Sequence, residues 1–487
     1  MNGSTLKRVA LGVGFSSFFF CFLLGVPLLA GDWASTSGSP SVSGQGNAYP
    51  GTMYDPVPST STVSYAENDA LDNRVAELEA ALAKIQKKEA EAKKKAEGAP
   101  SVTAGGRIHL DAAGFNQNTT SYEQIGDQEN GVEFRRARLF LKGDAFQILE
   151  YKAEYDFADT NEADGVLLQS TAFKDVYIAV KELPLLGHVR AGHFKEPIGL
   201  DQLTSSNFIS FMERSLPDEN GFVPGRNTGV MAYDNWAGEN GTWAIGCFVA
   251  DMTAEPPIFQ DDDGGLALSM RGTYLPWYDE ATEGRGLWHL GVSYSYRDSA
   301  NDTVRFRQRP ECHLADYIVD TGNIPFAPNW ELIGLETATV YGPLSFQAEW
   351  FSSFVNRSNA DPNLQYNGGY AYVSYFLTGE HRNYKREGGC FDRVTPHENF
   401  FRVRGQDDNI YTGKGAWEVL YRYSYLDLSE FVTEANHPGI VHDHTIGLNW
   451  YLNPYTRMMF NYVNSTLDNA DGVGNMSIFE VRSQIDF

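Results

Sequence analysis

Basic side chains at alternate positions are the residues in this sequence best placed to do chemistry. Arginines recur two apart in two stretches, the spacing that puts side chains on one face of an extended strand. Guanidinium and ammonium groups bind oxyanions through charge-assisted hydrogen bonds, so such rows indicate a surface that attracts anions. Each arginine could instead pair with a neighbouring carboxylate and select nothing, and that alternative stays open. The candidate anion-binding residues are the five arginines of these two rows and one isolated lysine: Arg136, Arg138, Lys195, Arg305, Arg307 and Arg309.

Signals for catalysis and metal binding are weaker. The sequence contains neither a GxSxG nor an HExxH pattern, which argues against a hydrolase. His442 and His444 alternate along one stretch with His437 nearby, but a pair of histidines on a strand is seldom a metal site by itself. The acidic run 261–263 lacks the spaced ligands of an EF-hand. We therefore expect no enzymatic activity, no metal and no other cofactor.

The charge balance of the chain is strongly acidic. Its 487 residues include 63 Asp and Glu against 38 Lys and Arg, which gives a formal net charge of −25. This excess of negative charge argues against nucleic acid as a partner. It also means that any preference for anions must come from local clusters of basic side chains.

The cysteines fit neither a disulfide scaffold nor a zinc site. Beyond residue 30 the chain contains Cys247, Cys312 and Cys390, an odd number without CxxC spacing. At most one pair can form a bridge.

The first hundred residues fall into three segments of different composition. Residues 1–30 combine two basic residues, an apolar run and a small residue at the end, the pattern of a secretory signal peptide, with a permanent membrane anchor as the alternative. Residues 31–65 are rich in Ser, Gly and Pro and predict a disordered spacer. Residues 66–98 space apolar residues three and four apart and predict a coiled-coil helix, followed by lysines that could contact an anionic cell-wall polymer. This helix either reinforces an oligomer or stands alone in solvent.

From residue 104 to residue 487 the apolar residues recur at every second position. In the stretch 286–298, Trp288, Leu290 and Val292 share one face with two tyrosines, whereas the opposite face carries histidine, serine and arginine. Strands of about ten residues with an aromatic face and a polar face are typical of a barrel that meets lipid outside and water inside. A soluble β-sandwich would bury its apolar face under a second sheet and would have shorter strands. The sequence therefore predicts an all-β fold, a transmembrane antiparallel β-barrel.

Sixteen such segments can be placed, an even number, as barrels of this kind require. They are 104–115, 132–146, 148–160, 170–182, 187–195, 226–236, 242–251, 267–277, 286–298, 331–341, 344–356, 366–378, 414–427, 441–451, 455–467 and 475–487. With both ends in the periplasm, the long connections 196–225 and 299–330 fall on the outer side. The long connection 379–413 then falls on the periplasmic side, where turns are normally short.

Five blocks between Gly105 and Phe487 resemble, in order, the phosphate-selective porin O and P family of outer-membrane porins. They are Phe134–Leu139, Gly192–Leu200, Phe211–Ser215, Phe376–Glu380, and Gly415–Glu418 followed by Arg422–Ser424. The resemblance implies a homotrimer of sixteen-stranded barrels in the bacterial outer membrane. It also implies that the third and fifth outer loops and one long periplasmic turn fold into the lumen and narrow it.

The resemblance further implies a non-enzymatic channel whose partners are lipid and small polar or anionic solutes such as phosphate. The third loop departs from the family, because its stretch 203–207 has no central lysine and Glu196, Asp201 and Glu213 add negative charge nearby. Cys312 and Cys390 would lie in two elements that fold inward from opposite sides, so a disulfide between them is a further hypothesis.

Two functions remain open at this point. The first is a porin through which small hydrophilic solutes, anions such as phosphate among them, diffuse passively. The second is a structural or adhesive barrel with a closed lumen, tethered to the cell wall by its periplasmic coiled coil. Either protein would be exported by its signal peptide to the outer membrane.

Overall fold

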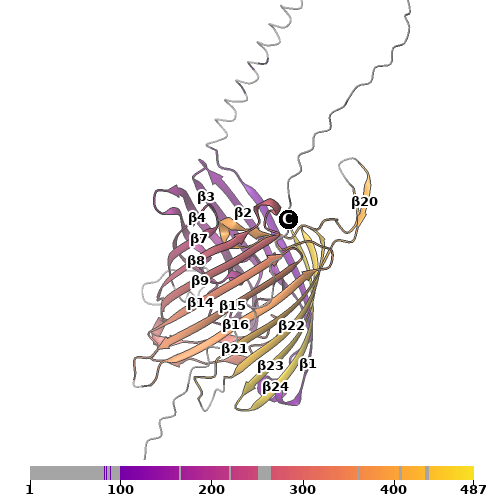
Figure 1. Ribbon diagram of the computed structural model, residues 1–487. Coiled ribbons are helices and arrows are strands. Elements are labelled where there is room, and N and C mark those ends of the chain that lie inside the picture. Colours follow the sequence, from indigo (N-terminus) through magenta and orange to yellow (C-terminus); the bar gives the residue numbers. More distant parts are fainter. Residues whose placement is uncertain are drawn as a thin grey trace, which may run out of the picture. The chain divides into compact units, whose positions relative to one another are not determined.

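The computed structural model describes residues 82, 84, 88, 99–163, 166–218, 221–249, 265–359, 361–404, 408–433 and 438–487 (Figure 1). The predicted signal peptide and spacer lie outside these residues, as does the predicted coiled coil except for three positions. None of the helices within the described ranges has the length and apolarity needed to cross a membrane.

The strands close into one antiparallel barrel of sixteen strands, in which consecutive strands pair and β1 pairs with β24. The predicted all-β fold and strand number are therefore confirmed, and the predicted strand ends differ from the observed ones by at most four residues. The strands are β1 (Thr103–Gln117), β2 (Gly131–Ala145), β3 (Leu149–Ala163), β4 (Val166–Leu183), β5 (Gly187–Lys195), β6 (Arg226–Trp236), β7 (Gly241–Val249), β8 (Leu266–Tyr278), β9 (Gly286–Asp298), β14 (Asn329–Tyr341), β15 (Leu344–Asn356), β16 (Leu364–Phe376), β21 (Ala416–Asp427), β22 (Ile440–Asn453), β23 (Thr456–Asn469) and β24 (Gly472–Asp486).

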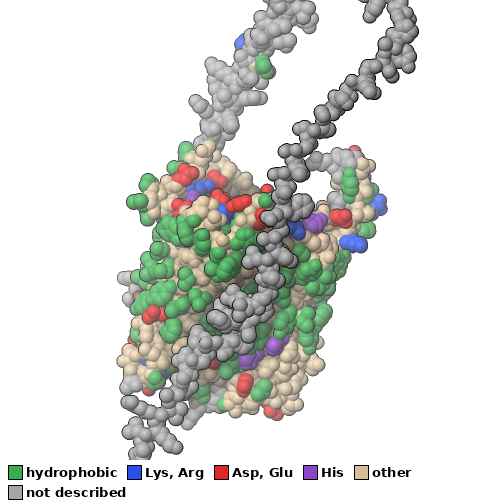
Figure 2. Space-filling view, viewed as in Figure 1, with side chains coloured by type: hydrophobic (Ala, Val, Ile, Leu, Met, Phe, Trp, Pro, Cys, Tyr) green, Lys and Arg blue, Asp and Glu red, His purple; other side chains and the backbone are tan. Residues whose placement is uncertain are grey.

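Alternation along the strands gives the wall an apolar outside and a polar inside. On β9, Trp288 and Val292 are 43% and 51% exposed, whereas His289 and Ser295 on the other face of the same strand are fully buried. Figure 2 shows apolar side chains spread over the middle of the wall. Such a face suits the hydrocarbon layer of a membrane, where only a closed sheet leaves no backbone group unpaired.

The two rims of the barrel differ in their connections. The rim that carries Thr103 and Asp486, here called the terminal rim, has short turns such as Gly342–Pro343 between β14 and β15. Gly342 adopts a φ of 57°, which glycine reaches without steric cost. The opposite rim, here called the loop rim, carries loop 3 (residues 196–225) and loop 5 (residues 299–328). One long connection, the inward turn (residues 377–415), leaves the terminal rim instead.

These connections contain short elements that the sequence does not predict, because two to seven residues are too few to show a period. One of them, α2 (Thr119–Ile125), begins where the side chain of Asn118 accepts a hydrogen bond of 2.8 Å from the N–H group of Ser121. The others are α3 (Leu200–Leu203), η1 (Glu280–Thr282), η2 (Ala300–Asp302), β10 (Thr303–Val304), β11 (Arg307–Gln308), β12 (Val319–Asp320), β13 (Ile324–Pro325), β17 (Tyr384–Lys385), η3 (Arg386–Gly388), β18 (Cys390–Phe391), β19 (Phe401–Arg404) and β20 (Ile410–Gly413).

Loops 3 and 5 fold into the lumen, as predicted, and so does the part of the inward turn up to Phe391, which meets Leu200 and Leu287 in one buried cluster. The later part of the inward turn, the hairpin of β19 and β20, instead projects from the barrel with exposed side chains such as Phe401 and Tyr411 (Figure 1).

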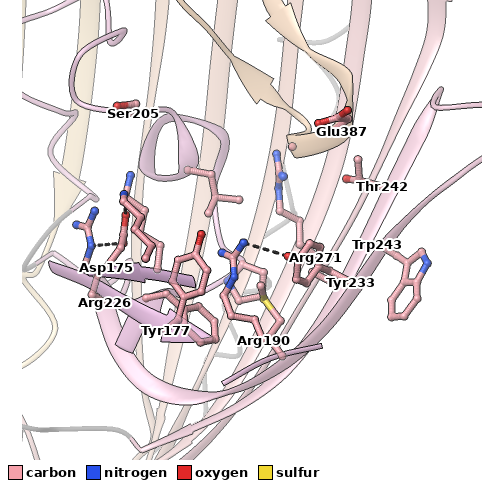
Figure 3. Close-up of a pocket in the computed structure, with 18 of the residues that line it drawn as sticks. Asp175, Tyr177, Arg190, Ser205, Arg226, Tyr233, Thr242, Trp243, Arg271 and Glu387 are labelled. Atoms are coloured by element: carbon pink, nitrogen blue, oxygen red, sulfur yellow. Dashed lines mark hydrogen bonds and ion pairs between the residues drawn. The ribbon is translucent and has the colours of Figure 1, made fainter. Parts of the chain in front are cut away.

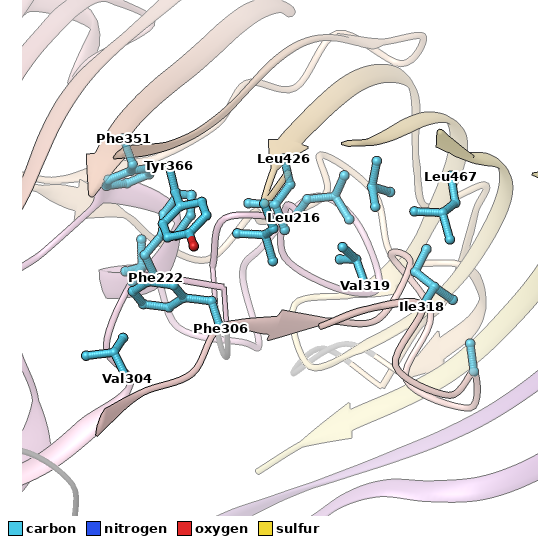
Figure 4. Close-up of a cluster of buried hydrophobic side chains, with 14 of the residues drawn as sticks. Leu216, Phe222, Val304, Phe306, Ile318, Val319, Phe351, Tyr366, Leu426 and Leu467 are labelled. Carbon is cyan, nitrogen blue, oxygen red and sulfur yellow. The ribbon is translucent and has the colours of Figure 1, made fainter. Parts of the chain in front are cut away.

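Loops 3 and 5 pack together against the wall in a hydrophobic cluster (Figure 4). At its centre the ring of Phe306 meets those of Phe222, Trp330 and Tyr366 edge to face, with centroids 5.6, 5.2 and 5.5 Å apart. Loop 5 contributes Val304, Phe306, Cys312, Ile318, Val319 and Ile324, loop 3 contributes Ile198, Leu216, Phe222 and Val223, and the wall contributes Phe351, Val355, Leu364, Tyr366, Leu426, Val441, Val463 and Leu467.

Replacing Phe306 by alanine should release loop 5 from the lumen. Phe306 is buried at the centre of the cluster, and removing a buried phenylalanine side chain costs about 3–5 kcal/mol. Limited proteolysis of the purified protein, read by mass spectrometry, should show new cleavage within residues 299–328. Phe346→Ala, on the outer face of β15, is the matched control and should leave loop 5 protected. Equal cleavage of loop 5 in wild type and Phe306→Ala would contradict its role as an anchor.

Candidate solute path

Beside the packed loops, two cavities follow the inner face of β1–β8. The first has a volume of about 330 Å³. The second, of about 850 Å³, extends to the terminal rim at Asp144 and Phe487. Arg107, Tyr177 and Arg190 line both cavities, so the two are adjacent parts of one path.

Loop 3 and the inward turn border this path from opposite rims. The guanidinium of Arg107 donates a hydrogen bond of 2.9 Å to the Ser206 hydroxyl of loop 3. From the other side, Gly388 of the inward turn lines the first cavity, and the next residue, Gly389, accepts a bond of 2.8 Å from Arg271. Wall arginines therefore fix both elements that narrow the path.

Basic side chains outnumber acidic ones around the first cavity, six against three among its lining residues (Figure 3). The basic residues are Arg107, Lys152, Arg190, Lys195, Arg226 and Arg271, and the acidic residues are Asp175, Asp234 and Glu387.

Carboxylates of the wall hold several of these cations in place. The two oxygens of Asp175 lie 2.6 Å from Nζ of Lys152 and 2.7 Å from Nε of Arg226. Arg107 lies 3.3 Å from Glu154. Such pairing offsets the cost of burying charge and lowers the net positive charge of the path. What remains around the first cavity is a moderate excess of cations, whereas the lining of the second cavity is nearly balanced, with seven basic residues against six acidic ones.

Arg190 has mainly aromatic neighbours. Its guanidinium carbon lies 4.0 Å from the ring centre of Tyr177 and 5.0 Å from that of Tyr233, and it donates a hydrogen bond of 3.0 Å to the Tyr233 hydroxyl (Figure 3). Cation–π contacts of this kind orient the guanidinium while leaving part of its edge available to a solute.

Glu213 attaches loop 3 to the wall. Its carboxylate accepts two hydrogen bonds of 2.9 Å from Arg135 and one of 2.6 Å from Arg482, and Arg482 also pairs with Asp111 at 2.6 Å. Burial by itself would raise the pKa of Glu213, but Arg135, Arg136 and Arg482 outweigh burial and hold this pKa well below its ordinary value. Loop 3 is thus fixed by an ionised carboxylate.

A second carboxylate holds the start of loop 3. Glu349 of β15 accepts hydrogen bonds of 2.6 and 2.8 Å from the backbone N–H groups of Leu200 and Asp201, at the beginning of α3. Side chains of β22 and β23 then donate to loop carbonyls, Asn449 to Ser210 and Arg457 to Ile209. Loop 3 therefore lies along the inner wall over most of its length.

Residues 102–487 match the family described as phosphate-selective porin O and P. This match covers most of the chain. The chain belongs to that family. It is a porin, a non-enzymatic channel protein with an outer-membrane porin fold.

The porin is similar to several known proteins. It is 26% identical over 419 residues to Porin O of Pseudomonas aeruginosa, which covers 79% of this chain and 87% of that one. It is 29% identical over 311 residues to an uncharacterized protein of Caulobacter vibrioides, with 62% and 56% of the two chains covered. A solved anion-selective porin from Comamonas acidovorans aligns over 80% of this chain and all of that one, at 13% identity and a TM-score of 0.47.

Among the predicted channel residues of the porin, Lys195 lines the first cavity, where its ammonium donates to backbone carbonyls of loop 3. Arg136 and Arg138 lie on the inner face of β2 and are only 2% and 8% exposed. Nε of Arg138 is 2.6 Å from Asp156, and neither arginine lines the two cavities of the path.

Arg305, Arg307 and Arg309 form a separate group on loop 5. The guanidinium groups of Arg307 and Arg309 lie over Tyr317, whose ring centre is 3.9 Å from Arg307 and 4.5 Å from Arg309. Arg305 donates a hydrogen bond of 2.9 Å to Asp320 instead. Arg309 also lines a third cavity of about 290 Å³ between loops 3 and 5.

The other cations of the first cavity were missed by reasoning from the sequence. Each is a single basic residue within or at the end of a predicted strand, so none belongs to a row of arginines two residues apart. A search for every cation on the polar face of the sixteen strands would have found them. They are Arg107, Lys152, Arg190, Arg226 and Arg271.

The hypothesis of a disulfide between Cys312 and Cys390 is wrong, because both cysteines are free. Cys312 packs in the hydrophobic cluster of loops 3 and 5, whereas Cys390, on the inward turn, packs against a separate cluster that contains Leu287 and Phe391. The two elements enter the lumen at different places and bury their sulfur atoms separately. Burial raises the pKa of both thiols, which keeps them in the unreactive form.

The alternating histidines face outward from β22. Their Nδ1 atoms lie 2.8 Å from tyrosine hydroxyls of β21, His442 beside Tyr423 and His444 beside Tyr421. Within the part of the chain that the structure describes, no three His, Cys, Asp or Glu residues are arranged to hold a metal ion. His437 and the acidic run 261–263 lie outside that part.

Replacing Glu213 by glutamine should loosen loop 3 and raise single-channel conductance. The substitution removes the carboxylate that Arg135 pairs with and leaves the buried Arg482 with Asp111 alone; breaking a buried ion pair costs about 3–5 kcal/mol. Planar-bilayer recording should show larger and noisier current steps for Glu213→Gln than for wild type. Asp320→Asn, which removes a carboxylate from loop 5 instead, is the control and should leave the step size unchanged.

The same pair of proteins tests the charge state of Glu213. Because its pKa is lowered on folding, the stabilisation by the carboxylate is complete above the ordinary pKa of about 4.5 and is lost only as pH falls through the lowered value. The difference in conductance between wild type and Glu213→Gln should therefore persist at pH 4.5. Convergence of the two at that pH would show that Glu213 is already protonated.

Proposed function

We propose that this porin lets small hydrophilic solutes diffuse along the path beside β1–β8 and favours anions, oxyanions such as phosphate included. The observation that carries the proposal is the excess of basic over acidic side chains around the first cavity, six against three. Charges lining a narrow aqueous path raise the local concentration of counter-ions and lower the barrier to their entry. Cations would be repelled by the same side chains.

Two of the three acidic residues noted in loop 3, Glu196 and Glu213, do not oppose this preference, since the wall neutralises them, and the third, Asp201, is buried and lines neither cavity of the path. Glu196 is buried with Arg297 at 2.7 Å, and Glu213 is held by Arg135 and Arg482. The negative charges of Glu196 and Glu213 therefore attach loop 3 to the wall. This pairing supports anion preference although loop 3 has no lysine at residues 203–207.

A broad preference for anions fits the path better than a dedicated phosphate site. The cations are spread over several strands and largely paired with carboxylates, for example Lys152 and Arg226 with Asp175. A site selective for phosphate gathers several unneutralised donors around one point. In this porin the donors are instead spread along the inner wall of the barrel.

Planar-bilayer recording separates this function from that of a closed structural or adhesive barrel. The purified porin should give stepwise currents, and in a KCl gradient its reversal potential should show permeation of chloride in excess of potassium. An absence of steps would favour the structural barrel, and a preference for potassium would contradict the proposed selectivity.

Neutralising cations of the path should shift the reversal potential toward cation permeation. A unit charge about 6 Å from a permeating ion in water contributes about 0.7 kcal/mol, or roughly threefold in relative permeability. We expect Lys195→Gln to show this effect at the first cavity, and Arg305→Gln, Arg307→Gln and Arg309→Gln combined to show it if loop 5 collects anions at the mouth. The control Arg404→Gln lies on β19, where the side chain is 69% exposed, and should change nothing. An unchanged potential in either test variant would remove that group from the path.

We also propose that the porin is a homotrimer exported to the outer membrane after removal of residues 1–30. A cluster of polar side chains on the outer face of β23 and β24 supports the trimer. Asn464 and Asn475 bond each other at 3.2 Å, Asn475 bonds Thr466 at 3.1 Å, and Tyr462 bonds Ser477 at 3.0 Å. Amides facing lipid are unfavourable, whereas a neighbouring copy would cover them. A coiled coil of residues 66–98 would then reinforce the assembly.

A bulky substitution on this face should weaken the trimer. Asn464→Trp should lower the temperature at which an SDS-resistant trimer dissociates on a gel, because a tryptophan cannot fit a packed interface. Val292→Trp on the outer face of β9, six strands away, is the matched control and should have no effect. Deleting residues 66–98 should lower the same temperature. Equal behaviour of Asn464→Trp and Val292→Trp would place the interface elsewhere.

A further inference from the structure

The first cavity of the path has an apolar side in addition to its charged side. Phe194, Met231 and Ala244 line it, together with the rings of Tyr177 and Tyr233. These residues belong to one hydrophobic cluster on β4–β8. Fully hydrated ions gain nothing from such a wall, since apolar contact stabilises only solutes that have apolar surface to bury.

Arg190 stands at the edge of this apolar side. Its guanidinium lies over Tyr177 and Tyr233 and 5.5 Å from the ring centre of Phe194. Its nearest carboxylate, Glu150, is 3.8 Å away, too long for a hydrogen bond. Nε of Arg190 is buried and donates no hydrogen bond to any residue that the structure describes.

These two features together point to one class of solute. A guanidinium group that is oriented mainly by aromatic rings suits a solute carboxylate, which can accept hydrogen bonds from its outer nitrogen atoms. The aromatic rings around it suit a flat apolar body, which stacks or packs edge-on against them. A cavity of about 330 Å³ is within the usual range for a small-molecule site.

We propose that Arg190, Tyr177, Tyr233 and the adjoining apolar wall form a subsite for small aromatic carboxylates, of which benzoate is the simplest. The carboxylate binds the Arg190 guanidinium and the ring packs against Tyr233, Phe194 and Met231. This inference rests on the proposed anion-favouring channel. It adds that the path distinguishes anions by their apolar part as well as by their charge.

The test is block of chloride current by added anions. Full-length porin in planar bilayers in KCl at pH 7 is titrated with benzoate, acetate or inorganic phosphate, and the concentration that halves the current is measured. We expect benzoate to act at a concentration at least tenfold lower than acetate. Tenfold is about 1.4 kcal/mol, of the size expected from burying one face of a ring. Phosphate should act no more strongly than acetate.

Four variants locate the effect. Arg190→Gln removes the guanidinium and Tyr233→Leu removes a ring, so each should bring the benzoate and acetate values within twofold of each other. Tyr177→Phe loses only the hydroxyl that bonds Glu150 at 2.6 Å and should keep the tenfold difference. Lys152→Gln neutralises a cation of the same cavity away from the rings, so it should weaken block by both anions equally. Heat-modifiable migration on a gel shows that each variant is folded.

The outcomes distinguish the subsite from the channel. Equal block by benzoate and acetate in wild type overturns the subsite and leaves an anion-favouring porin intact. A tenfold difference that survives Arg190→Gln and Tyr233→Leu, or that disappears in Lys152→Gln, also overturns it. If the pore does not conduct, or if it conducts potassium in preference to chloride, the proposed function is overturned. The subsite, which rests on that function, is then overturned as well.

Discussion

Backbone hydrogen bonding in lipid is the constraint from which the rest of this structure follows. A spanning strand must pair both of its edges, because the hydrocarbon layer offers no partner for an N–H or C=O group. Pairing of β1 with β24 meets that requirement by closing the sheet. Closure with sixteen strands, however, encloses a lumen too wide for the facing side chains to fill. Loops 3 and 5 and the inward turn occupy the space that closure creates.

Filling a polar lumen with chain requires that charge be balanced locally. Arg482, which is fully buried, meets both Asp111 and Glu213, and Arg271 meets Glu336 at 2.7 Å. An unpaired charge in such a place would cost several kcal/mol, so wall and loops carry matched groups. The ion pairs therefore explain how a strongly acidic chain can present cations to a solute. Its carboxylates are engaged in holding the loops, and the basic side chains of β1–β8 face the cavity.

The lumen is consequently divided into two parts with different roles. Beside β14–β24 the loops form a hydrophobic cluster centred on Phe306, which closes that part and stiffens the loops. Beside β1–β8 the wall is left open, with cations on one side and the rings around Arg190 on the other. Loop 3 belongs to both parts, since Phe222 enters the cluster while Ser206 borders the path. Any change that moves loop 3 therefore alters packing and permeation together.

The sequence by itself determined the barrel, the strands and the long connections, because the alternation of apolar and polar residues is a local property that each strand carries in full. The stretch 286–298, for instance, coincides with β9. The sequence by itself did not determine which cations line the path. Arg136 and Arg138 form a conspicuous row yet lie buried in the wall, whereas Arg107, Lys152 and Arg190 stand alone in the sequence and meet only in space. Such a site depends on strand order, on where loop 3 lies and on which carboxylate reaches which arginine. Those are contacts between residues far apart in the chain, and only the tertiary structure decides them.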